Sequence, residues 1–232
     1  MRALILDTAT PAVTAGVVDV TAAGVEVRAA RVTVDARAAG ELLAPHIAAV
    51  LDESGTAPDA LAAVVAGVGP GPYTSLRVGL VTAAAFGQAR GLPTYGVDTL
   101  DALGLAAAGL ADRVLVATDA RRREVYWAAY EGGRRLTGPA VAAPAAVAAA
   151  LPGVCLAAGA GGCVAVGEGA HRYADLLGVP AAEPRHPAVA ALAALAADRI
   201  RAGAPGETLT PHYLRRPDAV APTGRKTVRQ WS

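Results

Sequence analysis

The fold is indicated first by Arg2-Ala-Leu-Ile-Leu-Asp-Thr-Ala-Thr-Pro11, an apolar run that a polar turn ends. Val13–Val20 and Val25–Val34 then alternate apolar and other residues, with turn residues between them. A period of two is typical of strands, so we expect three consecutive antiparallel strands. Alternating elements follow: helices at Glu41–Glu53, Thr74–Arg90 and Thr99–Leu110, the last capped by Asp98, and strands at Leu61–Val68 and Thr94–Val97.

The same order starts again at Arg113, where Val114–Thr118 and Glu124–Glu131 are predicted to form a hairpin around Ala120–Arg123. A strand at Val164–Gly167 and helices near Ala145–Leu151, Ala170–Leu177 and Val189–Arg201 complete the prediction. We therefore expect an α/β chain with lobes at 1–111 and 112–216. The basic tail at 217–232, which contains Pro222 and Gly224, is expected to be flexible and without a core of its own.

Composition indicates a globular chain, because 53% of the 232 residues are hydrophobic, 18% are charged and the net charge is +1. Aromatic residues make up 4%, which argues against a groove lined with base-stacking rings. We infer no nucleic-acid preference from the excess of arginine over the single lysine. No segment has the pattern of a secretion signal or a membrane span, so we expect a cytoplasmic protein. Cys155 and Cys163 are expected to be reduced thiols.

The most informative segment is Gly67-Val-Gly-Pro-Gly-Pro-Tyr-Thr-Ser-Leu-Arg-Val-Gly79, a glycine loop between a strand and a helix. Its glycines and prolines preset the backbone, and Thr74 or Ser75 could cap the helix and leave N–H groups free for an anion. Its spacing differs from that of a Walker A loop. One interpretation is a rigid elbow without a ligand, beside an Asp7 that only opens a turn. The other is an anion or nucleotide faced by Asp7, Thr8, Gly69, Gly71, Thr74, Ser75 and Arg77.

Neither a metal site nor a catalytic residue is predicted. The four histidines are scattered, and His46 has Leu42 and Val50 four residues away on either side rather than a second histidine. Ser75 lies outside any G-x-S-x-G motif. The three arginines of Asp119-Ala-Arg-Arg-Arg-Glu124 are interpreted as the solvated tip of a hairpin.

Five segments, taken together and in this order, resemble the TsaB (YeaZ) family: Leu4–Thr10, Gly69–Gly79, Gly96–Leu100, Asp119–Ala128 and Tyr213–Arg216. The resemblance covers essentially the whole chain. It agrees with the predicted order of elements, which resembles two tandem ribonuclease-H-like lobes of the actin-like ATPase (ASKHA) superfamily, the second lobe truncated. It implies a non-catalytic scaffold in the bacterial synthesis of N6-threonylcarbamoyladenosine at position 37 of tRNA.

The resemblance also implies partners. They are the catalytic paralogue TsaD, the ATPase subunit TsaE and tRNA bound through the complex, with a homodimer when TsaD is absent. ATP and metal are expected on the partner subunits, and no cofactor on this one. The chain departs from the family at Ala39 and Gly40, where a histidine and a serine or threonine are common. An ATP-binding enzyme that uses Asp7, and a glycopeptidase that uses Ser75, stay open as alternatives.

Small residues at every fourth position of Thr74–Arg90 suggest that another helix can approach closely. We expect the partner to dock there and on Glu41–Glu53, the alternative being that both faces pack on their own sheet. The predicted partner face comprises Leu43, Ile47, Val50, Leu76, Gly79, Leu80, Ala83 and Gly87.

Overall fold

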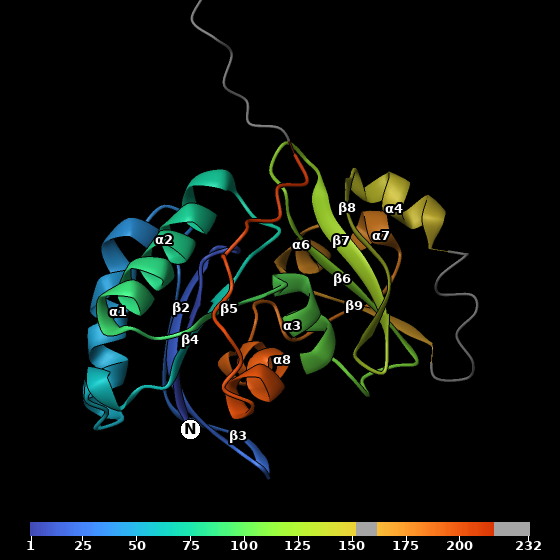
Figure 1. Cartoon of the computed structure of the whole chain (residues 1–232). Coiled ribbons are helices and arrows are strands. Elements are labelled where there is room, and N and C mark those ends of the chain that lie inside the picture. Colours follow the sequence, from blue (N-terminus) through green and yellow to red (C-terminus); the bar gives the residue numbers. More distant parts are fainter. Residues whose placement is uncertain (152–161, 216–232) are drawn as a thin grey trace, which may run out of the picture.

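The computed structural model describes residues 1–151 and 162–215, which form two five-stranded sheets with helices on their faces (Figure 1). The first sheet has the order β3-β2-β1-β4-β5. β1 pairs antiparallel with β2 and β2 with β3, whereas β1, β4 and β5 run parallel. The strands are β1 (Arg2–Asp7), β2 (Ala12–Thr21), β3 (Gly24–Val34), β4 (Ala63–Gly67) and β5 (Thr94–Val97).

Alternation along β1 directs its side chains to two separate cores. Leu4 and Leu6 pack with α1 (Ala39–Glu53) and α2 (Tyr73–Arg90). Ile5 faces the opposite way and packs against α8 (Val189–Arg201). The helix α8 lies in the range predicted for the second lobe, yet its apolar face covers the first sheet, so a division at residue 111 does not separate the two cores.

The second sheet has the order β10-β9-β6-β7-β8. On one face lies α3 (Thr99–Ala106), which joins the two lobes, and on the other lie α4 (Pro144–Ala150), α6 (Glu168–Arg172) and α7 (Ala174–Leu177). The Asp98 carboxylate caps α3, as predicted, by accepting bonds from the Leu100 and Asp101 N–H groups. The strands are β6 (Arg113–Asp119), β7 (Val125–Glu131), β8 (Arg134–Ala142), β9 (Cys163–Val166) and β10 (Ala181–Ala182).

Several predicted elements differ from the structure. The helix predicted at Ala170–Leu177 is two short helices, and β8 was not predicted, because Gly138 and Pro139 interrupt its pattern. Pro139 is tolerated since β8 is an edge strand whose pairing with β7 shifts register there. Cys163 is disulfide-bonded, which corrects the expectation of reduced thiols. Cys155 and the tail 217–232 lie outside the described residues.

After α8 the chain returns across both lobes as an irregular segment, here called the C-terminal strap (residues 203–215). Its Glu207 N–H donates to the Thr94 carbonyl, and its His212 N–H donates to the Val68 carbonyl, both at 2.8 Å. At its end the Arg215 guanidinium donates to the Ala120 carbonyl of the second lobe. Within the described residues, each helix is too short or too polar to cross a membrane.

Candidate functional site

The turn after β1 is buried beneath the glycine loop. Asp7 is 1% exposed, and its carboxylate accepts hydrogen bonds from the Thr99 hydroxyl at 2.7 Å and from the Ala9 N–H at 3.0 Å. A Cβ on Gly67 would lie 1.7 Å from an Asp7 carboxylate oxygen, and one on Gly71 would lie 2.3 Å from the Ala9 carbonyl. The glycines therefore allow the loop to lie directly on the turn.

The Thr8 hydroxyl is inserted between two groups of the α2 backbone. It donates to the Ser75 carbonyl at 2.6 Å and accepts from the Gly79 N–H at 3.1 Å, the pair that would otherwise bond across one helical turn. A Cβ on Gly79 would lie 2.4 Å from the Thr8 oxygen. Thr8 and Gly79 thus fix α2 against β1, and the hydroxyl proton of Thr8 is used within the fold.

The first turn of α2 differs from the prediction. Its N-cap residue is Pro72 and no side chain caps it, so neither Thr74 nor Ser75 has the capping role predicted. The Ser75 hydroxyl donates back to the Pro72 carbonyl. Arg77 is exposed, and its guanidinium donates to the Tyr73 hydroxyl and lies 5.1 Å from the centre of that ring.

The seven residues predicted to face an anion are therefore divided by the structure. Asp7, Thr8, Gly69 and Gly71 are buried in the packing between β1 and the glycine loop. Thr74 and Arg77 point away on the outer side of α2, and Ser75 is half-buried. This separation favours the interpretation of the loop as a rigid elbow.

Acidic groups gather where the two lobes meet. Burial raises the pKa of Asp7 to about 6 and that of Glu168 to about 7, and the charge of Asp7 contributes to the rise at Glu168. The Glu168 carboxylate accepts from the Asp119 N–H, and its other oxygen lies 3.9 Å from Nδ1 of His186, whose pKa burial lowers. Carboxyl groups that titrate near neutrality can transfer protons. No cluster of three or more His, Cys, Asp or Glu within residues 1–151 and 162–215 could hold a metal ion.

His46, the one histidine on α1, has a structural partner. Its Nε2 lies 3.1 Å from the Thr33 hydroxyl of β3. His212 of the strap has a partner as well, because its Nδ1 lies 3.2 Å from the Asp98 carboxylate that caps α3. Sequence reasoning did not identify this second contact, which joins residues 114 positions apart.

Every residue of the predicted partner face is buried in the chain's own first lobe, which favours the alternative that both helix faces pack on their own sheet. The small residues let α2 approach its own sheet: Gly79 meets Thr8, and a Cβ on Gly87 would lie 2.6 Å from the Thr94 methyl group. The residues concerned are Leu43, Ile47, Val50, Leu76, Gly79, Leu80, Ala83 and Gly87.

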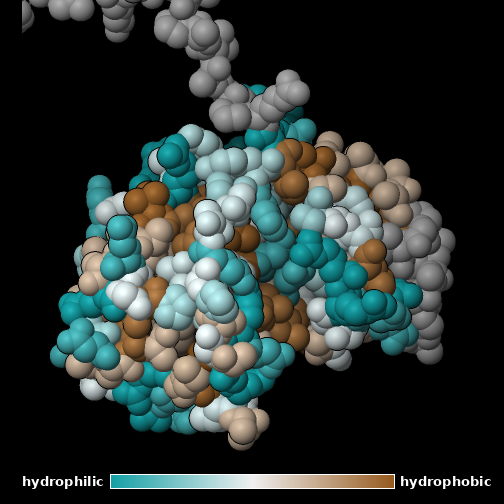
Figure 2. Space-filling view, viewed as in Figure 1, coloured by the Kyte–Doolittle hydropathy of each residue, from teal (hydrophilic) through white to brown (hydrophobic). Residues whose placement is uncertain are grey.

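A different set of residues forms the outer surface of the two helices. Val81 is 61% exposed, and apolar side chains reach the surface over α1 and α2 in Figure 2. They form an apolar groove in which Ile47 is the one member of the predicted face. The groove is lined by Ala44, Ile47, Val81, Thr82, Ala85 and Phe86.

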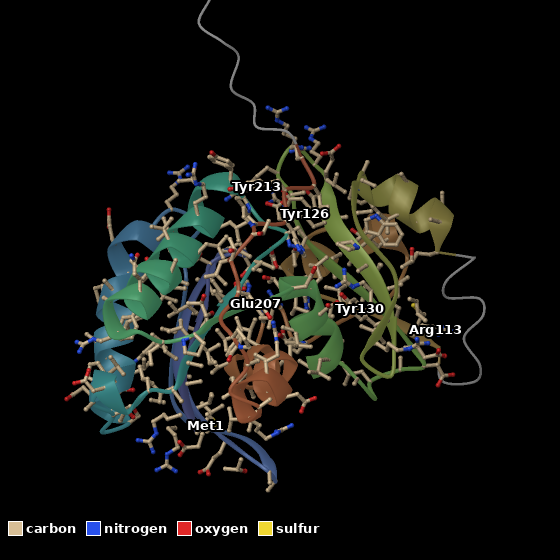
Figure 3. The ribbon with its side chains drawn as sticks, in the orientation of Figure 1. Met1, Arg113, Tyr126, Tyr130, Glu207 and Tyr213 are labelled. Atoms are coloured by element: carbon tan, nitrogen blue, oxygen red, sulfur yellow. The ribbon has the colours of Figure 1, made fainter. Side chains whose placement is uncertain are left out.

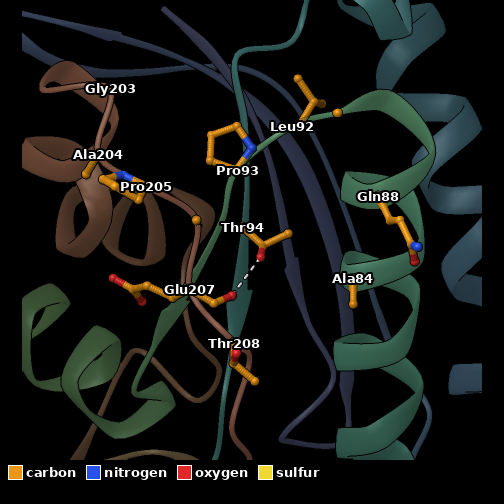
Figure 4. Close-up of a pocket in the computed structure, with 12 residues that line it drawn as sticks. Ala84, Gln88, Leu92, Pro93, Thr94, Gly203, Ala204, Pro205, Glu207 and Thr208 are labelled. Atoms are coloured by element: carbon orange, nitrogen blue, oxygen red, sulfur yellow. Dashed lines mark hydrogen bonds between the residues drawn. The ribbon is translucent and has the colours of Figure 1, made fainter.

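A second pocket lies between the end of α2 and the C-terminal strap (Figure 4). Within it the Thr94 hydroxyl donates to the Glu207 carbonyl at 2.9 Å. The Glu207 carboxylate is held by Arg199 at 2.7 Å, near the middle of the molecule in Figure 3. These contacts attach the strap to the first sheet.

Comparisons with known proteins identify a family and several relatives of this chain. A family model described as "TsaD: tRNA N6-adenosine threonylcarbamoyltransferase" matches residues 33–154. An uncharacterized Mycobacterium tuberculosis protein is 48% identical over 219 residues, 93% of this chain and 92% of that protein. A Mycobacterium leprae protein is 45% identical over 216 residues, 93% of this chain, and the chain spans 55% of its length.

Three further matches are to proteins with a descriptive name. The Escherichia coli tRNA threonylcarbamoyladenosine biosynthesis protein TsaB is 39% identical over 89 residues, 38% of each chain. The solved structure of YeaZ from Pseudomonas aeruginosa superposes with a TM-score of 0.73 at 27% identity, over 92% of this chain and 99% of that one. The ethanolamine utilization protein EutJ from Carboxydothermus hydrogenoformans, 16% identical with a TM-score of 0.51 over 84% of this chain and 89% of its own, shares the fold alone. The predicted fold class, two ribonuclease-H-like lobes of the actin-like ATPase superfamily, is confirmed.

Proposed function

Because this chain belongs to the family described as TsaD: tRNA N6-adenosine threonylcarbamoyltransferase, and within it resembles TsaB (YeaZ), we propose that it is the TsaB-type accessory subunit of that system. It acts with a TsaD-type catalytic subunit and a TsaE-type ATPase. The complex transfers the threonylcarbamoyl group from threonylcarbamoyl-AMP to N6 of adenosine 37 in tRNAs that read codons beginning with A. ATP and metal are held by the partner subunits.

The observation that carries the accessory role is the apolar groove over α1 and α2. Val81, Ala85 and Phe86 present an apolar surface beside Ala44, on the outside of the first lobe. Exposed apolar residues that adjoin one another favour burial against a second protein. The TsaD-type subunit occupies this groove, and a second copy of this chain occupies it when that subunit is absent.

The turn after β1 supports the same role. The Asp7 carboxylate accepts from the Ala9 N–H, the Thr8 hydroxyl donates to the Ser75 carbonyl, and the Gly71 backbone lies against Ala9. A loop packed in this way positions α2, and with it the groove. The chain therefore contributes a rigid docking surface to the complex.

The test is reconstitution of tRNA modification from purified components. We expect TsaD-type, TsaE-type and adenylate-forming proteins of the same organism to form modified tRNA only when this chain is added. Equal product yield with and without the chain would contradict the proposal. A groove variant that keeps its fold but no longer restores product would link the activity to the docking surface.

The alternative of an ATP-binding enzyme is favoured by one observation, the buried carboxyls of Asp7 and Glu168 with raised pKa values. It predicts saturable ATP binding and hydrolysis by the isolated chain, both lost in Asp7→Asn. The glycopeptidase alternative has less support, because the Ser75 hydroxyl donates to a backbone carbonyl of its own loop. It predicts peptide cleavage that Ser75→Ala abolishes.

A further inference from the structure

The tip of the β6–β7 hairpin has an unusual backbone. Arg121, Arg122 and Arg123 are consecutive and all left-handed, with φ of 62°, 51° and 61°. Glycine and asparagine adopt this conformation readily, whereas arginine is disfavoured in it. The turn is closed by the Ala120 N–H, which donates to the Glu124 carbonyl at 2.9 Å. Three arginines therefore stand where glycine or asparagine would be easier to accommodate, which points to a use for their charge.

Positive charge accumulates around this tip. All three tip arginines are exposed, Arg172 of α6 lies 3.0 Å from the Asp119 carboxylate, and Arg215 pairs with Glu124. Among residues 1–151 and 162–215, these five guanidinium groups outnumber the nearby carboxylates of Asp119, Glu124 and the buried Glu168, and Asp119 is shared by Arg172 and Arg121, the latter at 3.8 Å. Arg123 forms no ion pair with any residue in the described ranges.

A column of stacked groups lies next to the tip. The Tyr73 and Tyr213 rings have centres 5.1 Å apart with an angle of 31° between their planes, and the Arg77 guanidinium lies over Tyr73. Both rings are partly exposed, at 44% and 40%. Arg215, which bonds the tip at the Ala120 carbonyl, is two residues after Tyr213, a span of at most about 7 Å. Figure 3 shows Tyr213 and Tyr126 at this same end of the molecule.

We propose that this end of the molecule is an RNA-binding surface, on which the Arg121–Arg123 tip contacts phosphates and the Tyr73–Tyr213 column stacks on an unpaired base. Arginine suits phosphate because its planar guanidinium can donate two hydrogen bonds. Aromatic rings beside a basic surface are the combination that binds single-stranded segments. The low aromatic content argues against a groove lined with rings, but the Tyr73–Tyr213 pair is sufficient for one base.

The proposal rests on the proposed function, since tRNA is the RNA that the complex would bring to this surface. It goes further by placing a tRNA contact on the accessory subunit itself. The positive charge of this surface could also bind an acidic protein. The exposed tyrosine column favours RNA instead, because its rings can stack on a base.

The experiment measures tRNA affinity of the assembled complex as a function of salt. The test variant is Arg121→Asn/Arg122→Asn/Arg123→Asn, because asparagine tolerates the left-handed turn while removing the charge. The matched control, Arg28→Asn/Arg31→Asn/Arg37→Asn, removes three exposed charges from β3 and the loop after it. A second control, with lysine at all three tip positions, keeps the charge.

We expect the test variant to bind tRNA about tenfold or more weakly at 0.15 M salt. The slope of log affinity against log salt should fall by about two units, because each phosphate contact contributes about 0.7 to 0.9. The β3 control should bind as the wild type does, and the lysine variant should keep most of the affinity. Tyr213→Leu should weaken binding about fivefold and leave the slope unchanged.

Unchanged affinity and slope in the test variant would overturn the proposal, as would an equal loss in the β3 control. Loss of partner-protein association with unchanged tRNA affinity would assign the tip to a protein instead. These outcomes do not test the proposed function. That function is tested first, by whether the wild-type chain restores tRNA modification. A complex that still modifies tRNA with unchanged tRNA affinity would refute only the RNA surface.

Discussion

The turns after β1 and β6 occupy equivalent places in the two lobes but have opposite surroundings. Each follows an aspartate at the end of a strand, Asp7 in one lobe and Asp119 in the other. The strand pairs in parallel with β4 in the first lobe and with β9 in the second. Residues 7–10 are buried, whereas Arg121–Arg123 are exposed and left-handed.

The difference follows from what lies over each turn. In the first lobe the glycine loop leads into α2, which has 18 residues and covers the turn. In the second lobe Gly167 packs on the Ala117 carbonyl in a similar way, but the helix that follows, α6, has only five residues. The short helix leaves the second turn uncovered. One turn therefore determines packing, and the other determines surface charge.

The largest expected effect on stability comes from a substitution that disrupts the packed turn after β1. Gly79→Ala places a methyl group 2.4 Å from the Thr8 oxygen, and should lower the free energy of unfolding by about 2 to 3 kcal/mol. Chemical denaturation of the purified chain measures this. Combining it with Thr8→Ala removes the clashing hydroxyl, so the double variant should be clearly more stable than the sum of the single changes predicts. If the changes in unfolding free energy of the two single variants simply add in the double variant, Thr8 is not the group that limits the approach of α2.

The next effect concerns the buried carboxyl of the same turn. Folding raises the pKa of Asp7 to about 6, above its unfolded value, so the folded state favours the protonated form. Its stabilising contribution is full below about pH 4 and is lost as the pH rises through 6. Relative to Asp7→Asn, the wild type should lose about 2 to 3 kcal/mol of unfolding free energy between pH 4 and pH 8. Parallel pH profiles for the two proteins would argue that Asp7 is solvated.

The exposed turn should respond in the opposite direction. Arg123→Gly relieves a left-handed arginine with φ of 61°, and should raise the unfolding free energy by about 0.5 to 1 kcal/mol. Thermal unfolding measures the change, with Arg134→Gly in β8 as a control that should destabilise. Destabilisation by Arg123→Gly would contradict the claim that a left-handed arginine strains this turn.

Much of the fold could be predicted from sequence because it depends on local pattern. The alternation in Val13–Val20 and the helical period in Val189–Arg201 identified their elements, and Asp98 identified a helix start. β8 was missed because a glycine and a proline lie within it.

The candidate site was harder to predict, because its contacts join residues far apart in the chain. Small residues such as Gly79 signal close approach but not the partner, and here the partner is Thr8, 71 positions away. The left-handed conformation of the Arg121–Arg123 tip could not be predicted either, because arginine has no preference for that conformation. The outer face of α2 could be recognised only after the inner face had been assigned.

Association through the groove of α1 and α2 is the central claim, and a direct binding measurement tests it. Val81→Arg changes a 61% exposed residue, so its effect on stability should be within about 0.5 kcal/mol. Val27→Arg on β3, where valine is 41% exposed, is the matched control. Titration calorimetry with the purified TsaD-type subunit should show binding of the wild type and of Val27→Arg, and at least a hundredfold weaker binding of Val81→Arg. Equal affinity of all three would contradict the account.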